Sequence, residues 1–108
     1  MKYVDVLKAL ADQNRLAILC YLMSGSKCVC EIENILPISQ SATSKQLGRL
    51  RMVGIIDAEK KGQWVYYQLV SNIYELYPFL KELLEGVDAQ YKFSKRGKQM
   101  DCSENSFH

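Results

Sequence analysis

The sequence predicts a winged helix-turn-helix, a mainly α-helical fold with a β-hairpin wing and the element order α-α-α-α-β-β-α. Four segments within residues 4–54 carry apolar residues at helical spacing, and a capping residue, a glycine and a proline separate them. The pattern then alternates over residues 55–69, as in a hairpin, and afterwards returns to helical spacing. A chain of 108 residues has the size of one small domain.

The first two helices are predicted from the spacing of their apolar residues. Val4, Leu7 and Leu10 recur on what would be one helix face. Asp12 is a suitable N-cap residue for the second helix, and Gly25 ends that helix. Two short helices joined by a brief turn are therefore expected at the start of the chain.

The third and fourth helices form the predicted helix-turn-helix. Residues 28–36 carry apolar side chains at helical spacing, and Pro37 closes this segment. Ser39 or Ser41 then caps a fourth helix, for which Gly54 is the natural stop. A supporting helix, a short turn and a second helix thus follow one another in the order that this motif requires.

A hairpin and a final helix complete the predicted fold. Residues 55–59 and 64–69 are rich in β-forming residues, and Gly62 between them supplies the positive φ of a tight turn. The last helix begins near Ser71, and we expect Pro78 to interrupt it.

Composition divides the chain into a folded part and a tail. The sequence is 48% hydrophobic and 24% charged, which is ordinary for a globular protein, and its formal net charge is +2. Large apolar residues become rare after residue 87, so we expect a folded domain over residues 1–87 and a mobile polar tail over residues 88–108. The chain has no signal-peptide core, and no apolar run approaches the length of a membrane span, about 20 residues, which predicts a cytoplasmic protein without a membrane partner.

The first and last helices carry more apolar surface than one small core requires. The residues concerned are Val4, Leu7, Leu10, Leu80, Leu83 and Leu84. An interface between two copies would bury this surface, so we expect residues 1–87 to serve for dimerisation as well as folding, and the protein to be a homodimer.

The fourth predicted helix has the outward face of an element that reads DNA. Short hydroxyl side chains let a helix enter the major groove, glutamines bond adenine edges, and lysine or arginine reaches guanine or phosphate. Two lysines beside the hairpin turn suit the backbone or an adjacent minor groove. The expected contacts to double-stranded DNA are Gln40, Ser41, Thr43, Ser44, Lys45, Gln46, Arg49, Lys60 and Lys61. The alternative is a solvated helix face beside an ordinary turn.

Cys28 and Cys30 are the candidate metal ligands. Thiolates are soft ligands, and this pair precedes the predicted DNA-reading helix. A sulfur-only pair disfavours magnesium, calcium and manganese and fits trivalent arsenic or antimony, or cadmium or lead with further ligands. Cys102 is a possible third thiolate if the tail folds back, whereas Cys20 falls on an inward helix position. No organic cofactor is expected.

The spacing of the two cysteines predicts a mechanical effect. Residues two apart on an ideal helix point about 200° apart, because each residue turns about 100°. Because the predicted third helix includes both Cys28 and Cys30, they cannot both face one ion while it stays regular, so binding by both thiolates should unwind or distort its start. Such a distortion would move or loosen the DNA-reading helix that follows.

Other interpretations of these patterns remain open. The two cysteines are also consistent with simple packing or with a thiol redox sensor, because exposed thiolates oxidise. A DNA-binding regulator that ignores metals is the alternative from another class. The sequence shows no cysteine–histidine pair, phosphate loop or carboxylate constellation placed for catalysis, so we do not expect an enzyme.

Several motifs resemble the ArsR/SmtB family of metal-sensing repressors, in particular its arsenic-responsive members. The motifs are Leu10-Ala11-Asp12 with Arg15-Leu16, Lys27-Cys28-Val29-Cys30-Glu31-Ile32, Gln40-Ser41-Ala42-Thr43-Ser44-Lys45-Gln46-Leu47, Gly54-Ile55-Ile56 and Gly62-Gln63-Trp64-Val65-Tyr66-Tyr67. They occur in the family's order and span roughly residues 4–87. The resemblance implies a homodimeric repressor that binds operator DNA without metal and releases it when a thiophilic ion binds, with arsenite or antimonite as first candidates.

The sequence departs from the family's pattern at three places. Gln46 stands where many members carry histidine, which bears on base preference. Glu33 stands where some arsenic sensors have a third cysteine, so the implied ligand set is incomplete. The last helix has no histidine, so the zinc site that some members build there cannot form from residues 73–87, and the single histidine of the chain is His108.

Overall fold

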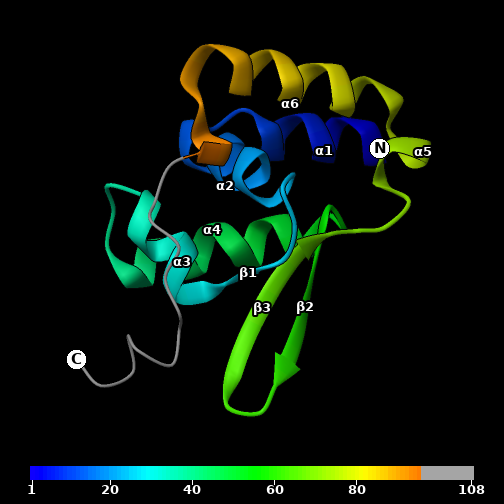
Figure 1. Ribbon diagram of the computed structural model, residues 1–108. Helices are drawn as coiled ribbons and strands as arrows, with labels where there is room; N and C mark the ends of the chain where they lie inside the picture. Colours follow the sequence, from blue (N-terminus) through cyan, green and yellow to red (C-terminus); the bar gives the residue numbers. More distant parts are fainter. Residues whose placement is uncertain (96–108) are drawn as a thin grey trace.

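The computed structural model describes residues 1–95, which form a winged helix-turn-helix (Figure 1). The elements are α1 (Lys2–Leu10), α2 (Gln13–Leu22), β1 (Lys27–Cys28), α3 (Val29–Ile35), α4 (Gln40–Met52), β2 (Ile56–Lys61), β3 (Trp64–Leu69), α5 (Ile73–Leu76), α6 (Pro78–Tyr91) and the 3-10 turn η1 (Phe93–Lys95). The predicted order of four helices, a hairpin and an interrupted final helix is confirmed, with one added strand, β1.

The helices begin and end where their capping residues allow. The Asp12 carboxylate accepts a hydrogen bond from the Arg15 backbone N–H at 3.0 Å and so caps α2. Ser39 caps α4 in the same way, because its hydroxyl accepts from the Ala42 N–H at 3.1 Å. Gly54 follows α4 with φ +81°, the left-handed region that glycine reaches without strain.

The wing is part of a three-stranded antiparallel sheet in the order β1-β3-β2. In the hairpin Lys61 pairs with Trp64, so the turn itself consists of Gly62 and Gln63, and Gly62 has the expected positive φ of +64°. Strand β1 pairs Cys28 with Tyr66 on β3, an arrangement that the sequence did not predict. The first candidate cysteine is therefore part of the same sheet as the wing.

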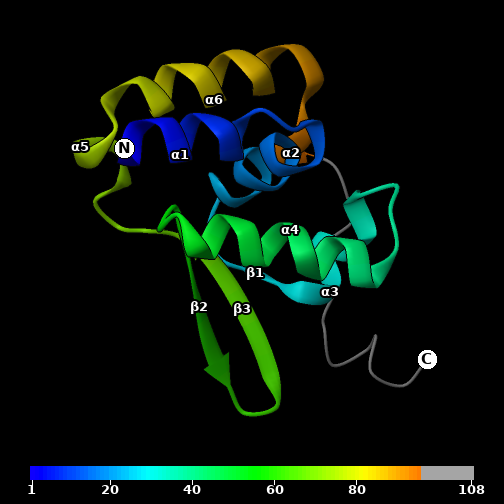
Figure 2. The ribbon, with the colours of Figure 1, turned by 180° about the vertical axis from the view of Figure 1, so that it is seen from behind.

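The core surrounds α2, which contacts α1, α4, α6, β3 and η1. Its six C-terminal residues, 17–22, are all buried, as expected for a helix enclosed on every side. Figures 1 and 2 show α1 and α6 side by side on one edge of the molecule, with α4 crossing below them and the hairpin projecting away. Pro78 lies in the first turn of α6, where a proline is tolerated, and separates it from α5.

The C-terminal helix runs further than expected. It continues to Tyr91, and Phe93 in η1 is only 5% exposed because η1 packs against α2. The folded part thus extends past the boundary at residue 87 as far as Lys95, while residues 96–108 of the expected tail lie outside the described residues. Within residues 1–95 no helix combines the length and the apolar character that a membrane crossing needs.

Candidate DNA interface and thiol site

The outer face of α4 presents polar side chains to solvent. Gln40, Ser41, Ser44 and Lys45 are exposed there, as the spacing of the sequence predicts. Gly48 lies on the same face, and a Cβ added to it would meet no atom within 4 Å. A face with short side chains and one bare backbone position leaves room for close approach of a nucleic-acid groove.

Thr43 belongs to the core and not to this outer face. Its side chain is fully buried, and its hydroxyl donates to the Ser39 carbonyl at 3.0 Å. It lies on the inward stripe of α4 with Leu47 and Leu50, both of which are also buried. The expected DNA contact at Thr43 is therefore wrong, because one helix face cannot meet the core and the DNA together.

Gln46 is occupied by a contact within the protein. Its side-chain oxygen accepts from Arg15 Nη1 at 2.6 Å, and the side chain is half-buried. The same arginine donates through Nε to the Ala9 carbonyl at 2.5 Å and through Nη2 to the Lys8 carbonyl at 3.4 Å. Arg15 thus joins the last carbonyls of α1 to the reading helix, a link that no local sequence pattern signals.

The two wing lysines lie at the end of β2, beside the turn. Lys60 and Lys61 are both exposed. The Lys61 ammonium is 5.4 Å from the centre of the Tyr66 ring, a cation–π distance that holds it near the hairpin. A paired strand end with two exposed cations is suited to a phosphate backbone.

Cys28 and Cys30 are brought together at the junction of β1 and α3. Their Sγ atoms lie 3.1 Å apart. Thiolate ligands stand about 2.3 Å from a bound zinc ion, so sulfurs up to about 4.6 Å apart can share one ion of similar bond length. The Glu31 carboxylate accepts from the Cys28 backbone N–H at 3.0 Å and fixes the residue that precedes α3.

The prediction that a shared ion must distort the start of a helix is wrong. Cys28 is the N-cap of α3 and has the extended backbone angles φ −67° and ψ 149°, so only Cys30 is inside the helix. The angular argument holds for two residues of one helix, whereas here the change of backbone direction turns both sulfurs to the same side. The pair can meet an ion while α3 remains regular.

The rest of the ligand set is not found among residues 1–95. Within these residues no third histidine, cysteine, aspartate or glutamate gathers with the two sulfurs. Partial burial raises the pKa of Glu33, the residue that stands where the resemblance implies a third cysteine, above its ordinary value. Cys102, the possible third thiolate, lies outside the described residues.

Cys20 is a core residue, as its helical position predicts. It is fully buried, and its sulfur lies 3.5 Å from the Leu84 carbonyl. Burial, followed by the nearby charge of Asp88, raises the pKa of this thiol to about 12.

We therefore expect Cys20 to resist thiol reagents in the folded protein. Because its pKa is raised, hardly any thiolate exists at pH 8, and the stability that the neutral thiol contributes is lost only as the pH rises from about 9 towards about 12. Mass spectrometry after alkylation at pH 8 measures this, with protein unfolded in urea as the control. Labelling of Cys20 at equal rates in both samples would contradict it.

The exposed polar helix, the wing and the helix-turn-helix arrangement together define a DNA-binding regulator of the winged-helix class. The chain belongs to the ArsR family. Residues 12–58 match the model described as "Bacterial regulatory protein, arsR family", and this chain aligns with most of the length of a solved relative. That relative is HlyU from Vibrio cholerae, with a TM-score of 0.65 and 37% identity over 76% of this chain and 90% of HlyU.

Two resistance regulators are also similar to this chain. The arsenic resistance transcriptional regulator ArsR1 of Pseudomonas putida is 39% identical over 83 residues, 76% of this chain and 62% of that protein. The cadmium resistance transcriptional regulatory protein CadC of Listeria innocua is 42% identical over 67 residues, 61% of this chain and 56% of that protein. The chain thus spans less than two thirds of either one. These relatives are transcription regulators and not enzymes, as the sequence predicts.

Proposed function

We propose that this protein is a homodimeric repressor that binds operator DNA and releases it when trivalent arsenic or antimony binds Cys28 and Cys30. The observation that carries the proposal is the 3.1 Å separation of the two sulfurs at the junction of β1 and α3. A relative named for arsenic resistance supports the choice of ion, although another is named for cadmium resistance. The soft sulfur pair suits both classes of ion.

The sulfur pair is connected to both parts of the proposed DNA interface. On one side α3 packs against α4, the reading helix. On the other side Cys28 pairs with Tyr66 on β3, a strand of the wing. The Tyr66 ring in turn contacts the Lys61 ammonium. An ion at the pair therefore acts at the point where the supports of the helix and the wing meet, and a change there alters their relative placement.

An exposed apolar face supports the proposed dimer. The large apolar side chains of α1, α5 and α6 that remain exposed are Tyr3, Val4, Leu7, Leu76, Phe79, Leu83 and Tyr91. Because α1 and α6 run side by side on one edge (Figure 1, Figure 2), a second copy packed there would cover residues from both helices at once. Removing this area from water is favourable by about 25 cal/mol per Å² of apolar surface.

The proposal is tested by measuring DNA affinity with and without candidate ions. A duplex selected from random sequence by the ion-free protein is labelled, and its fluorescence anisotropy is followed with arsenite, antimonite, cadmium, zinc and peroxide. We expect arsenite and antimonite to weaken binding about 5- to 150-fold, the usual range for coupling between two sites.

Three other outcomes would contradict the proposal, each in a different way. Release by peroxide alone would replace the proposal with a redox sensor, for which two sulfurs 3.1 Å apart are also well placed. Binding that no ion and no oxidant changes would show a metal-independent regulator. Failure to select any duplex would contradict the DNA-binding role itself.

A further inference from the structure

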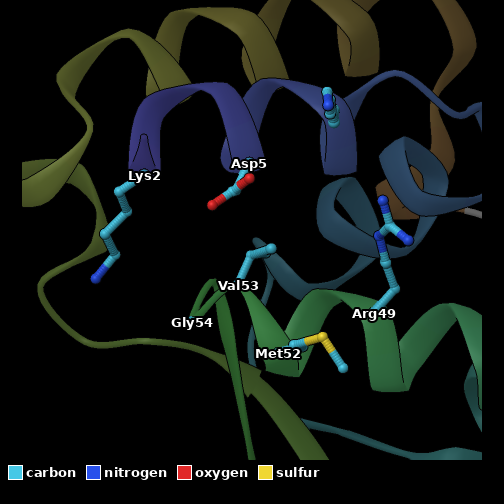
Figure 3. Close-up of a pocket in the computed structure, with 7 residues that line it drawn as sticks. Lys2, Asp5, Arg49, Met52, Val53 and Gly54 are labelled. Carbon is cyan, nitrogen blue, oxygen red and sulfur yellow. The ribbon is translucent and has the colours of Figure 1, made fainter.

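A cleft of about 630 Å³ lies between α1 and the C-terminal end of α4 (Figure 3). It is lined by Lys2, Asp5, Lys8, Arg49, Met52, Val53 and Gly54. Three of these side chains are cationic and one is anionic, so the lining carries a net charge of +2. A concave surface with this balance favours an anionic ligand.

The cations come from two separate elements and line the same cleft. Lys2, Asp5 and Lys8 follow one another at intervals of three residues along α1 and so lie on one face of that helix. Arg49 lies on α4. Figure 3 shows the Arg49 side chain rising from α4 towards α1 and α2, away from the outer face of the reading helix. Arg49 is exposed, so its guanidinium remains accessible to a ligand.

The cleft is continuous with the proposed DNA interface. Arg49 is one turn of α4 beyond Lys45, which belongs to the exposed outer face. Met52 is 84% exposed at the border between that face and the cleft. DNA seated on α4 therefore has a path for its backbone towards α1.

We propose that this cleft is a phosphate-binding site that takes the sugar–phosphate backbone of the bound DNA. Lys2 and Lys8 are six residues apart, about 9 Å along α1, whereas successive phosphates of one DNA strand are spaced about 3.4 Å along the helix axis. The two lysines thus span more than one phosphate. Arg49 bonds a phosphate from the α4 side, and the apolar Val53 and Met52 contact the sugars.

Asp5 is the one anionic group that opposes this use of the cleft. Figure 3 shows its side chain directed into the space between the two helices. Within residues 1–95 neither it nor the three cations take part in an ion pair of 4 Å or less, so the cations are not neutralised by fixed contacts. The carboxylate disfavours a phosphate beside it and so directs the backbone to the lysines on either side.

The proposal rests on DNA binding in the proposed function, but not on the response to ions, and the salt dependence of binding tests it. Each phosphate contact contributes about 0.9 to the slope of log affinity against log salt concentration. We expect Lys8→Gln to reduce the slope for a labelled duplex by about 0.9 per bound protomer, and Lys2→Gln with Lys8→Gln to reduce it by about 1.8. Thermal unfolding checks that each variant is folded.

Lys81→Gln is the matched control, because Lys81 is exposed on α6 and does not line the cleft. An unchanged slope for the cleft variants, or an equal reduction for the control, would overturn the proposal. Saturable amide shifts of cleft residues with inorganic phosphate, together with unchanged slopes, would overturn DNA as the source of the phosphate. If the wild-type protein binds no duplex, the proposed function fails, whereas wild-type binding with unchanged slopes disproves only the role of the cleft.

Discussion

We expect Cys28→Ser to abolish the proposed release of DNA by arsenite, while the protein still folds and binds DNA. The serine removes one sulfur of the pair, and the other is then the single thiol at this junction among residues 1–95. Serine is a preferred N-cap residue, so the start of α3 is kept. In the wild type we expect arsenite to weaken DNA binding about 5- to 150-fold. In the variant the affinity should be the same with and without arsenite, as measured by the anisotropy titration.

Cys20→Ala is the control for this experiment, because Cys20 lies on α2 in the core and is not part of the Cys28–Cys30 sulfur pair. We expect it to lower stability, because a packed side chain is removed, but to leave the proposed arsenite response intact. Cys30→Ser has the same effect as Cys28→Ser if both sulfurs bind one ion. A full arsenite response in either junction variant would disprove the shared site.

We expect Leu7→Lys combined with Leu83→Lys to convert the proposed dimer into a monomer. The two leucines are 53% and 37% exposed on α1 and α6, so lysines are tolerated in the single chain but would bury charge in an interface. Joining two binding modules strengthens binding about 100-fold or more, and DNA affinity should fall accordingly. Sedimentation equilibrium measures the mass, and the anisotropy titration measures the affinity.

Ala89→Lys is the matched control for the dimer variant. Ala89 is exposed on α6, six residues after Leu83, and each residue of an α-helix turns about 100°. Ala89 therefore lies about 120° round the helix from Leu83, and a lysine there adds charge away from the proposed interface. This variant should leave both mass and affinity unchanged. A double leucine variant that remains dimeric would show that another surface of the protein forms the interface.

Features that depend on neighbouring residues were predictable from the sequence. The caps at Asp12 and Ser39, the positive φ of Gly62 and the break at Pro78 each follow from the chemistry of one residue and its neighbours. The outward polar stripe of α4 was predictable because its period is that of a helix. Thr43 shows the limit of residue type alone, since a hydroxyl suited to DNA serves a buried bond here.

Features that join distant segments were not predictable. The bond between Arg15 and Gln46 spans 31 positions, and the cleft combines residues of α1 with residues of α4. The pairing of β1 with β3 involves two residues only, too few for an alternating pattern to show. Because this strand was not predicted, Cys28 was wrongly placed inside the third helix. A residue in a sheet does not follow the rotation of a helix, so the predicted separation of about 200° between the two sulfurs does not apply.

Strand β1 has a further consequence for the energetics of regulation. Its two residues bond to one edge of the wing sheet, and a typical backbone hydrogen bond contributes about 0.5–1.5 kcal/mol to stability. Detaching so short a strand therefore costs roughly the 1–3 kcal/mol that separates ligand-bound from ligand-free affinities in regulated proteins. In the proposed mechanism, the binding of one ion at Cys28, the last residue of β1, would therefore supply enough free energy to detach the strand from β3.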